Sequence, residues 1–546
     1  MAALALNLLI FLPLAAAVLV WLGPERRTEL PRRIALGVSL LTFVLALGLW
    51  VDVAPGRLTG ETERSWIAVG DWVPVTDDRA ELSSGLLIRY HVGLDPVSGA
   101  LVLLTGLLVP LAVAGSFTGI RTRQREYYAW MLALTSAMFG VFAARDVILF
   151  YIFFEFTLVP LYFLIGIWGG PERRYAANKF FLFTFVGSVI TFAGLLYLGI
   201  RAAQLAHDPI VSFGFDRFMG LDGLGVSEQA LLFAALFAGF AIKVPLFPLH
   251  TWLPLAHTEA PTAGSVLLAG ILLKLGTYGF LRLALPVVPE GALYWTTTMG
   301  WLAVAGIIYG ALCSWLQRDV KKLVAYSSVS HLGFCMLGMF SLLPVGLSGS
   351  VLYMINHGIS TGALFLVVGM LYERYHTRDM TALGGLAWQM PVLAFFLVLF
   401  TLSSIGLPGL NGFVSEFTVL LAAYNSPHLG PTFGVLGATG ILLGAVYMLY
   451  MCGRVLFGPV KEPAGTPDLS AGLPRDLGRR EVAILAPLAV LVVLLGVYPR
   501  LVTDPIDPLL HDEILARFTP PAAVAAAEPV ALLEPAGTYA AGGLEP

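Results

Sequence analysis

The sequence predicts an all-α polytopic membrane protein with about 14 transmembrane helices, including two inverted five-helix repeats. The first reason is composition: of 546 residues, 58% are hydrophobic and 12% are charged, and the mean hydropathy is +0.82. These values exclude a soluble globular protein. The second reason is that apolar runs of about 20 residues, the length that crosses a bilayer as a helix, follow one another along the chain. The third is that two of these runs are too long for one crossing and contain prolines, as in the broken helices of secondary transporters.

Charge and cysteine content exclude two further classes. The 32 basic and 35 acidic residues are nearly balanced, which indicates no nucleic-acid partner. The three cysteines, Cys313, Cys335 and Cys452, lie far apart on apolar segments. Their spacing would not hold zinc, haem or an iron–sulfur cluster, so we expect no redox centre in this chain. The first residues lack a basic region and a cleavage site, so they are interpreted as a membrane span.

The apolar runs and the breaks between them place the individual spans. They lie near residues 2–22, 32–51, 94–118, 127–144, 146–169, 176–200, 229–257, 262–286, 294–316, 321–342, 347–372, 390–425, 434–458 and 481–500. The loops at 52–93 and 201–228 hold short alternating apolar pieces, which predict a hairpin or a surface helix. The segment 501–546 is rich in proline and alanine and is expected to trail along the surface.

The distribution of basic residues predicts the orientation of these spans. Twenty of the 32 lie in loops that follow odd-numbered spans, ten lie on the other side, and Lys243 and Lys274 lie within spans. Basic loops stay on the cytoplasmic side of a membrane. Both termini are therefore expected on the outer face.

The two proline-broken spans suggest an internal repeat. The span at 229–257 is interrupted at Pro245 and Pro248, and the span at 390–425 at Pro408. Each is the fourth of five consecutive spans, and two tandem sets of five insert with opposite orientation. A simple kink at each proline is the alternative. The resulting regions are residues 1–126 with the first spans and an outer loop, 127–286 and 287–458 with one repeat each, 459–500 with an inner loop and the last span, and 501–546 as the tail.

Two lysines at mid-membrane depth are the strongest functional signal. Glu228 lies 15 residues before Lys243 and His257 lies 14 after it, so the ammonium falls near the midplane. Lys274 lies about 12 residues from each end of its span. A desolvated lysine can lose its proton whereas arginine stays charged, so these lysines suit a proton-carrying role. A static ion pair that fixes helix packing is the alternative for Lys243.

Buried carboxylates and histidines complete the candidate site. Glu155 is surrounded by aromatic residues, and facing Lys243 it would hold the proton of that lysine. Glu416 follows the second broken helix, as Lys243 precedes the first break. His331 and His357 lie within spans between these groups, where they would pass protons or serve packing.

Several polar residues near these groups have weaker signals. His250 and His257 follow the first break, where an entrance role and a backbone-capping role are both open. Asp146, Arg145 and Glu259 lie at span ends, where interfacial anchoring is favoured. Hydroxyl groups near the two mid-span histidines would hold linking waters; they belong to Tyr326, Ser327, Ser328, Ser330 and Thr361.

Four stretches carry a resemblance to a known family: AIKVPLFPLHTWLPLAHTEAPTAGSVLLAGILLKLGTYG, FFEFTLVP, AYSSVSHLGF and LPGLNGFVSEF. They resemble the antiporter-like subunits of respiratory complex I, the proton-pumping NADH:quinone oxidoreductase, over roughly residues 90–460. Within that family, a glutamate at Glu416 is similar to the M-type subunit (mitochondrial chain four). Sister subunits more often carry lysine there.

The resemblance implies a proton-translocating membrane-arm subunit of a multisubunit enzyme. Glu155 and Lys243 would be a coupled pair, Lys274 the central relay and Glu416 the terminal group, while His331 and His357 match positions on the central polar axis. FMN, iron–sulfur clusters and quinone would belong to partner subunits, and L-type and N-type subunits would be neighbours. The location implied is a bacterial inner membrane.

Three other functions stay open at this point. The same motifs occur in subunits of multisubunit cation/proton antiporters and membrane-bound hydrogenases. An autonomous transporter of a small solute would need a polar pocket at the broken helices. A scaffold with inert ion pairs would not depend on Lys274 or Glu416.

Overall fold

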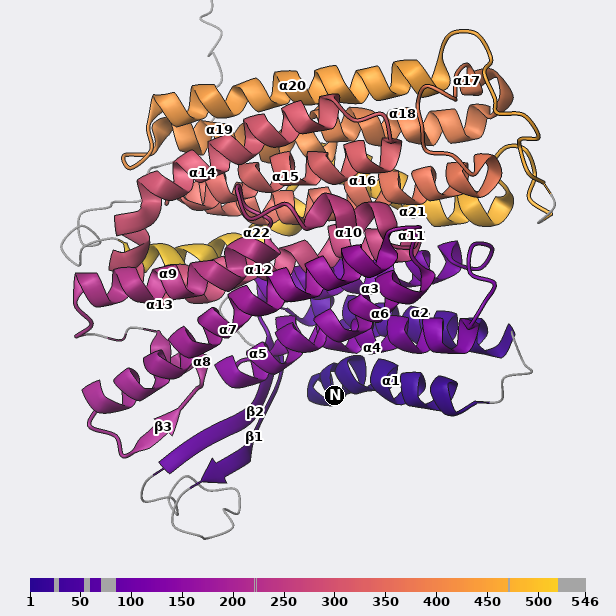
Figure 1. The fold of residues 1–546 in the computed structure, drawn as a ribbon. Coiled ribbons are helices and arrows are strands. Elements are labelled where there is room, and N and C mark those ends of the chain that lie inside the picture. The colour runs from indigo at the N-terminus through magenta and orange to yellow at the C-terminus, as the bar shows by residue number, and fades with distance from the viewer. Residues whose placement is uncertain are drawn as a thin grey trace, which may run out of the picture.

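The apolar runs fold into long helices that lie side by side, as Figure 1 shows for the computed structural model of the chain. The structure describes residues 1–23, 29–53, 59–69, 85–219, 221, 223–469 and 472–518. Within these ranges, eleven helices are long and apolar enough to cross a membrane. They are α1 (Ala2–Leu22), α2 (Glu29–Asp52), α3 (Pro96–Gly115), α5 with α6 (Val147–Trp168), α7 (Arg173–Leu205), α9 (Val226–Lys243), α11 to α13 (Thr262–Val287), α14 (Pro289–Trp315), α16 (Pro344–Tyr375), α20 (Pro431–Leu456) and α21 (Arg479–Val497).

Helices also occupy the remaining predicted spans. They are α4 (Gln124–Ala143), α15 (Val320–Met339), and α18 (Pro391–Ile405) with α19 (Asn411–Asn425). The chain is thus a polytopic helical membrane protein, while a total of fourteen crossings stays a prediction.

The two predicted helix breaks are present. Helix α9 ends at Lys243, two residues before Pro245, and the chain becomes helical again in α10 (Leu253–Glu259). Helix α18 ends before Gly406, which has φ +79°, and α19 begins after Pro408 and Gly409. Proline lacks the backbone N–H that continues a helix, which explains both interruptions.

Two further irregularities were not predicted. The fifth span is interrupted at Thr157, between α5 (Val147–Phe156) and α6 (Leu158–Trp168). The eighth span contains two π-helical segments, η2 (Leu268–Leu272) and η3 (Phe280–Ala284). In chain order, the span consists of α11 (Thr262–Leu267), η2, α12 (Leu273–Gly279), η3 and α13 (Leu285–Val287). Such segments often lie at functional sites, and here they flank the helix that carries Lys274.

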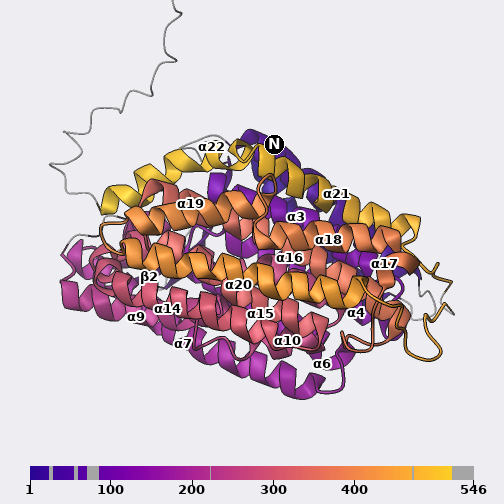
Figure 2. The same cartoon turned by 90° about the horizontal axis from the view of Figure 1, so that it is seen from above.

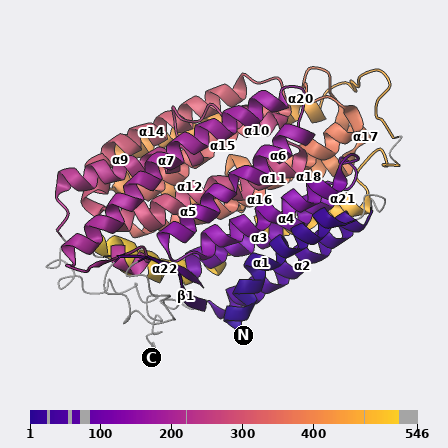
Figure 3. The ribbon, with the colours of Figure 1, turned by 60° about the horizontal axis from the view of Figure 1, so that its bottom comes forward.

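Two spans are enclosed by the others on all sides. The apolar windows of 262–287 and of α16 are entirely buried, whereas that of α2 is 28% buried. Helix α16 packs against α3, α15, α18 and α19, and Figure 2 shows it within the bundle. Figure 3 shows α1 and α2 at one edge of the bundle and α7, α9 and α14 toward the opposite edge. Polar side chains on 262–287 and α16 are therefore shielded from lipid.

A three-stranded sheet projects from one end of the bundle (Figure 1). It contains β1 (Thr59–Val69), β2 (Gly85–Leu94) and β3 (Ile210–Ser212) in the order β1-β2-β3, with β1 antiparallel and β3 parallel to β2. The predicted hairpin in 52–93 is confirmed for its two strands, and its connection at 70–84 lies outside the described residues. The 201–228 loop provides β3 and the short helix α8 (Phe215–Phe218).

The expectation of a trailing tail is wrong for its first part. Residues 500–517 form α22 (Arg500–Leu509), η4 (Leu510–Ile514) and η5 (Leu515–Arg517). Ile506, Leu509 and Ile514 are buried there, because apolar residues recur at helical spacing between the prolines. Residues 519–546 lie outside the described residues. A short helix, α17 (Leu386–Gln389), precedes α18.

Candidate functional site

All six candidate residues lie inside the helical bundle, on six different elements. They are Glu155 on α5, Lys243 on α9, Lys274 on α12, His331 on α15, His357 on α16 and Glu416 on α19. Five of them are at most 5% exposed, and Glu155 is half-buried. Burying this many ionisable groups is costly unless they are paired or functional.

Lys274 and His357 are in direct contact. The Nζ atom of Lys274 lies 2.6 Å from Nδ1 of His357 and also donates a hydrogen bond to the backbone carbonyl of Ala269. Ala269 lies in the π-helical segment η2, whose wider turns leave carbonyl oxygens off the regular α-helical ladder. The lysine is therefore held by one backbone acceptor and one group that can exchange a proton.

His331, on the neighbouring helix α15, packs against His357 and so continues the series of polar groups. Its ring meets that of His357 edge to face, with 5.6 Å between centroids, and lies 6.0 Å from the ring of Tyr353. The Tyr447 hydroxyl is 3.5 Å from Nε2 of His331. Three helices, α15, α16 and α20, thus place exchangeable groups around one point.

Glu416 lies on α19, just after the second helix break, and is the last polar group of this series. The Tyr353 hydroxyl donates a hydrogen bond of 2.7 Å to Oε1 of Glu416. A Cβ on Gly406 would overlap with the other oxygen, Oε2, so any larger residue there would force this carboxylate to move. We call Lys274, His357, His331, Tyr353 and Glu416 the central row.

A small cavity lies beside the central row. It has about 10 Å³ for the centre of a water-sized sphere, which is room for about one water molecule. Five buried atoms on its lining residues have no hydrogen-bond partner among the described residues: Asn356 Oδ1, His357 Nε2, Thr361 Oγ1, Ser404 Oγ and Glu416 Oε2. Buried polar atoms normally have partners, so this cavity has the character of a water site.

Glu155 and Lys243, the predicted coupled pair, lie within electrostatic range of each other but form no ion pair. Lys243 Nζ donates a hydrogen bond of 3.1 Å to the Thr157 hydroxyl and lies 4.5 Å from the centroid of the Phe154 ring. Phe154 and Thr157 are three positions apart and share one helix face, whereas Glu155 lies about 100° around the helix. Glu155 remains within electrostatic range of Lys243, and its Oε1 atom is buried without a partner among the described residues.

The site therefore consists of two groups. The described residues include no hydrogen bond or ion pair that links Lys243 to Lys274. Between them, the α9 and α12 backbones pack closely at Gly276, where a Cβ would meet the Phe240 carbonyl at 2.7 Å. His250 packs against Phe247 and Tyr309.

Three contributing residues were missed in the sequence. Tyr353, Tyr447 and Thr157 lie in apolar runs where aromatic and hydroxyl residues are common packing residues. Only contacts with other spans identify them. A polar cluster next to Glu416 was missed for the same reason; it joins Asn356 to Asn411, and Ser360 to Ser403.

The charged residues at span ends have structural partners. Asp95 lies 2.8 Å from Arg145 and 2.9 Å from Arg282, and Arg282 also pairs with Glu513 of η4. The Asp146 side chain caps the start of α5. Glu259 accepts a hydrogen bond from the backbone N–H of Glu172.

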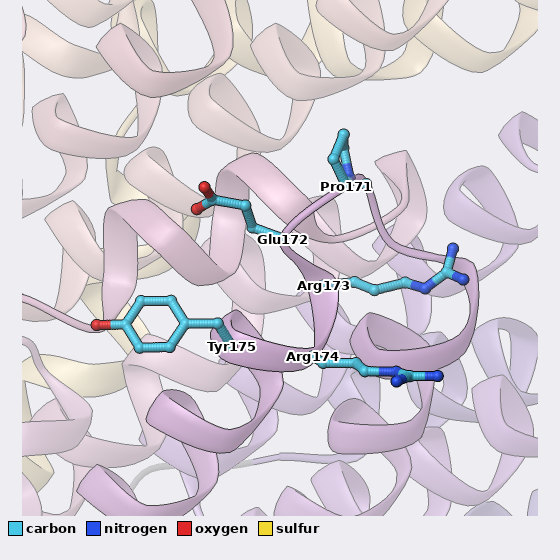
Figure 4. Close-up of a pocket in the computed structure, with 6 residues that line it drawn as sticks. Pro171, Glu172, Arg173, Arg174 and Tyr175 are labelled. Carbon is cyan, nitrogen blue, oxygen red and sulfur yellow. The ribbon is translucent and has the colours of Figure 1, made fainter.

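A larger depression lies elsewhere, at the turn that starts α7. It is lined by residues 170–175 and is open to the surroundings, and Figure 4 shows Arg173 and Arg174 extending to one side and Glu172 and Tyr175 to the other. None of the central row lines it. No group of three or more His, Cys, Asp or Glu side chains that could hold a metal ion occurs among the described residues.

Comparisons with known proteins agree with this architecture. Residues 144–455 match the profile of a family described as NADH:quinone oxidoreductase/Mrp antiporter, TM. NADH-quinone oxidoreductase subunit M of Rhodobacter capsulatus is 41% identical over 92% of this chain and 95% of its own. NADH-ubiquinone oxidoreductase chain 4 of Marchantia polymorpha is 38% identical over 90% and 93%. A chain of respiratory complex I from Thermus thermophilus with bound NADH superposes with a TM-score of 0.80, at 30% identity over 95% of this chain and all of that one.

Proposed function

The chain belongs to the NADH:quinone oxidoreductase/Mrp antiporter transmembrane family, and on this premise we propose how it moves protons. It is a proton-translocating membrane-arm subunit of NADH-quinone oxidoreductase, of the subunit M or chain 4 type. Protons pass along the central row between Lys274 and Glu416. NADH oxidation and quinone reduction in other subunits drive this transfer.

The contact between Lys274 and His357 carries the proposal. A buried ammonium 2.6 Å from an imidazole nitrogen can hand over its proton without a change of position. The rings of His357 and His331 and the hydroxyl of Tyr353 continue toward Glu416. Water in the cavity beside Thr361 and Ser404 provides a second connection from His357 to Glu416.

Lys243 and Glu155 act as a switch at the other end. The Glu155 carboxylate interacts electrostatically with Lys243 without touching it. A small movement of α5 would therefore change the strength of this interaction and the tendency of Lys243 to keep its proton. The cation–π contact with Phe154 and the hydrogen bond to Thr157 hold the ammonium meanwhile.

The membrane arrangement follows from the loop charges. The chain crosses a bacterial inner membrane fourteen times, with the arginine-rich loops in the cytoplasm and both termini outside. Regions 127–286 and 287–458 are inverted repeats, each with its broken helix beside a functional charge.

The partners and cofactors lie outside this chain. L-type and N-type antiporter-like subunits flank it in the membrane arm, and FMN, iron–sulfur clusters and quinone are held by other subunits. Affinity purification tests this directly. Co-purified flavin and iron–sulfur subunits are expected, and their absence would favour a cation/proton antiporter or membrane-bound hydrogenase assembly.

The proton pathway is tested by Glu416→Gln in the whole complex. Gln keeps the size of the side chain but cannot take up a proton, so NADH-driven proton pumping into sealed vesicles should fall about 100-fold. NADH oxidation with an artificial acceptor should persist, since it needs only the peripheral subunits. Glu290→Gln, an exposed carboxylate at the start of α14, is the matched control. Normal pumping by an assembled Glu416→Gln complex would refute the pathway.

A further inference from the structure

A polar vestibule opens at the end of the bundle that carries the arginine-rich loops. Its cavity is about 390 Å³, and it is lined by residues of both signs, including Glu259, Lys321, Glu373, His376 and Arg378. This size holds several water molecules. The vestibule reaches inward to the C-terminal end of α10, the helix that follows the first break.

Lys321 forms the inner wall of this vestibule. It is 7% exposed, although its place at the start of α15 suggested an ordinary loop lysine. Its Nζ atom donates hydrogen bonds to the backbone carbonyls of Ala260 and Thr258, at the end of α10. Arg378 donates to the same Thr258 carbonyl and pairs with Asp319. Arg378, which is always charged, thus already donates to the carbonyls at the end of α10. Capping this helix end therefore does not require a lysine at position 321.

His257 directly precedes Thr258, one of the two residues whose carbonyls Lys321 contacts. Its side chain is fully buried, and neither ring nitrogen has a hydrogen-bond partner among the described residues. The ring stacks on Phe365 of α16, with centroids 4.7 Å apart. A phenylalanine would make the same stacking contact without the cost of burying two polar nitrogens. The packing alone thus gives no reason for an imidazole.

The face of α16 that meets His257 leads to the central row. Phe365, Thr361 and His357 are spaced four residues apart, one helical turn each, so they lie on one face over about 12 Å. Thr361 is 1% exposed and its hydroxyl has no partner among the described residues. It also lines the small cavity that His357 lines. Lys274 and Lys321 are both within electrostatic range of His257.

We propose that Lys321, His257 and Thr361 form the proton uptake route from the vestibule to Lys274 and His357. The Lys321 ammonium gives a proton to an imidazole nitrogen of His257, which breaks one N–H bond and forms another, and the resulting amine takes a new proton from vestibule water. His257 then passes its proton along the Thr361 hydroxyl to the central row. This route rests on the proposed function and adds where its protons come from.

Substitutions that keep the contacts but block proton exchange test the route in the whole complex. Lys321→Arg can still donate to the Thr258 and Ala260 carbonyls, and His257→Phe keeps the stacking on Phe365. Each should lower NADH-driven proton pumping at least about tenfold, while assembly and NADH oxidation with an artificial acceptor stay normal. Lys322→Arg, at the exposed neighbouring lysine, should pump normally.

A second pair of variants covers the case in which Lys321→Arg or His257→Phe fails to assemble. Thr361→Val removes a hydroxyl that has no described partner and should lower pumping, whereas Thr361→Ser keeps the hydroxyl and should not. Normal pumping by Lys321→Arg, His257→Phe and Thr361→Val, with Glu416→Gln inactive, would overturn this route and leave the proposed function intact. If Glu416→Gln also pumps normally, the proposed function itself fails.

Discussion

Nζ of Lys274 and Nδ1 of His357 lie 2.6 Å apart, with both side chains almost completely buried. When the lysine is charged, Nδ1 accepts its proton in a hydrogen bond, so a neutral His357 carries its own proton on Nε2. Nε2 is one of the unpartnered atoms on the residues that line the small cavity. The imidazole therefore faces a proton donor on one side and a water site on the other.

His357→Gln should block this transfer. Glutamine can accept a hydrogen bond from Lys274 but does not take up and release protons, so NADH-driven pumping should fall about 100-fold. Proton uptake and release by vesicles, compared with His428→Gln at an exposed histidine, is the measurement. Equal pumping by the two variants would remove His357 from the pathway.

Tyr353→Phe should weaken the last step. The change removes the hydrogen bond to Oε1 of Glu416, so neither carboxylate oxygen retains a protein partner in the described residues. A hydrogen bond to a charged group contributes roughly 1.5–3 kcal/mol, which corresponds to about 10- to 100-fold in rate. Steady-state pumping measures this, with Tyr294→Phe, at an exposed tyrosine, as the control. An unchanged rate would mean that Tyr353 only packs.

Gly406→Ala should displace the Glu416 carboxylate. The added Cβ would overlap with Oε2, and φ at this position is +79°. Gly409→Ala separates the two effects, because Gly409 has φ +91° but no atom within 4 Å of its Cβ position. Pumping should be lost in Gly406→Ala and kept in Gly409→Ala. Equal losses would point to backbone strain at the break and not to the carboxylate.

Arg374→Ala should destabilise the assembled protein without a direct effect on proton transfer. Arg374 forms a double hydrogen bond with Glu481, both at 2.8 Å, and both side chains are buried. Removing one partner leaves an uncompensated buried charge, at a cost of about 3–5 kcal/mol. Thermal unfolding of the purified complex should shift far more than for Arg475→Ala, which removes an exposed arginine that pairs with the half-buried Glu462. The double variant with Glu481→Ala should recover part of the loss.

Much of the fold could be predicted because a membrane helix is recognisable in the sequence as a long apolar run. The helix breaks after Lys243 and before Asn411 could also be predicted, since proline cannot continue a helix. The interruption at Thr157 and the π-helical segments around Lys274 could not, because no residue type requires them. The helical segment 500–517 was missed because its prolines masked the spacing of its buried apolar residues.

The site could be predicted only as a set of unusual residues. Lys274, His331, His357 and Glu416 attract attention individually because ionisable groups are rare in membranes. Their contacts depend on how four spans pack, which residue spacing does not determine. The contacts of Lys243 could not be predicted for the same reason: Phe154 and Thr157 lie at the lysine, and Glu155 lies about 100° further around α5.

The most direct test of the central row is the proton-to-electron ratio of a complex that carries Lys274→Met. Methionine fills the space of the lysine stem but carries no proton, so the ratio measured in sealed vesicles should fall below that of the unmodified complex. Lys322→Met, at the exposed lysine on α15, should leave the ratio unchanged. A fully assembled Lys274→Met complex with an unchanged ratio would contradict proton transfer through the central row.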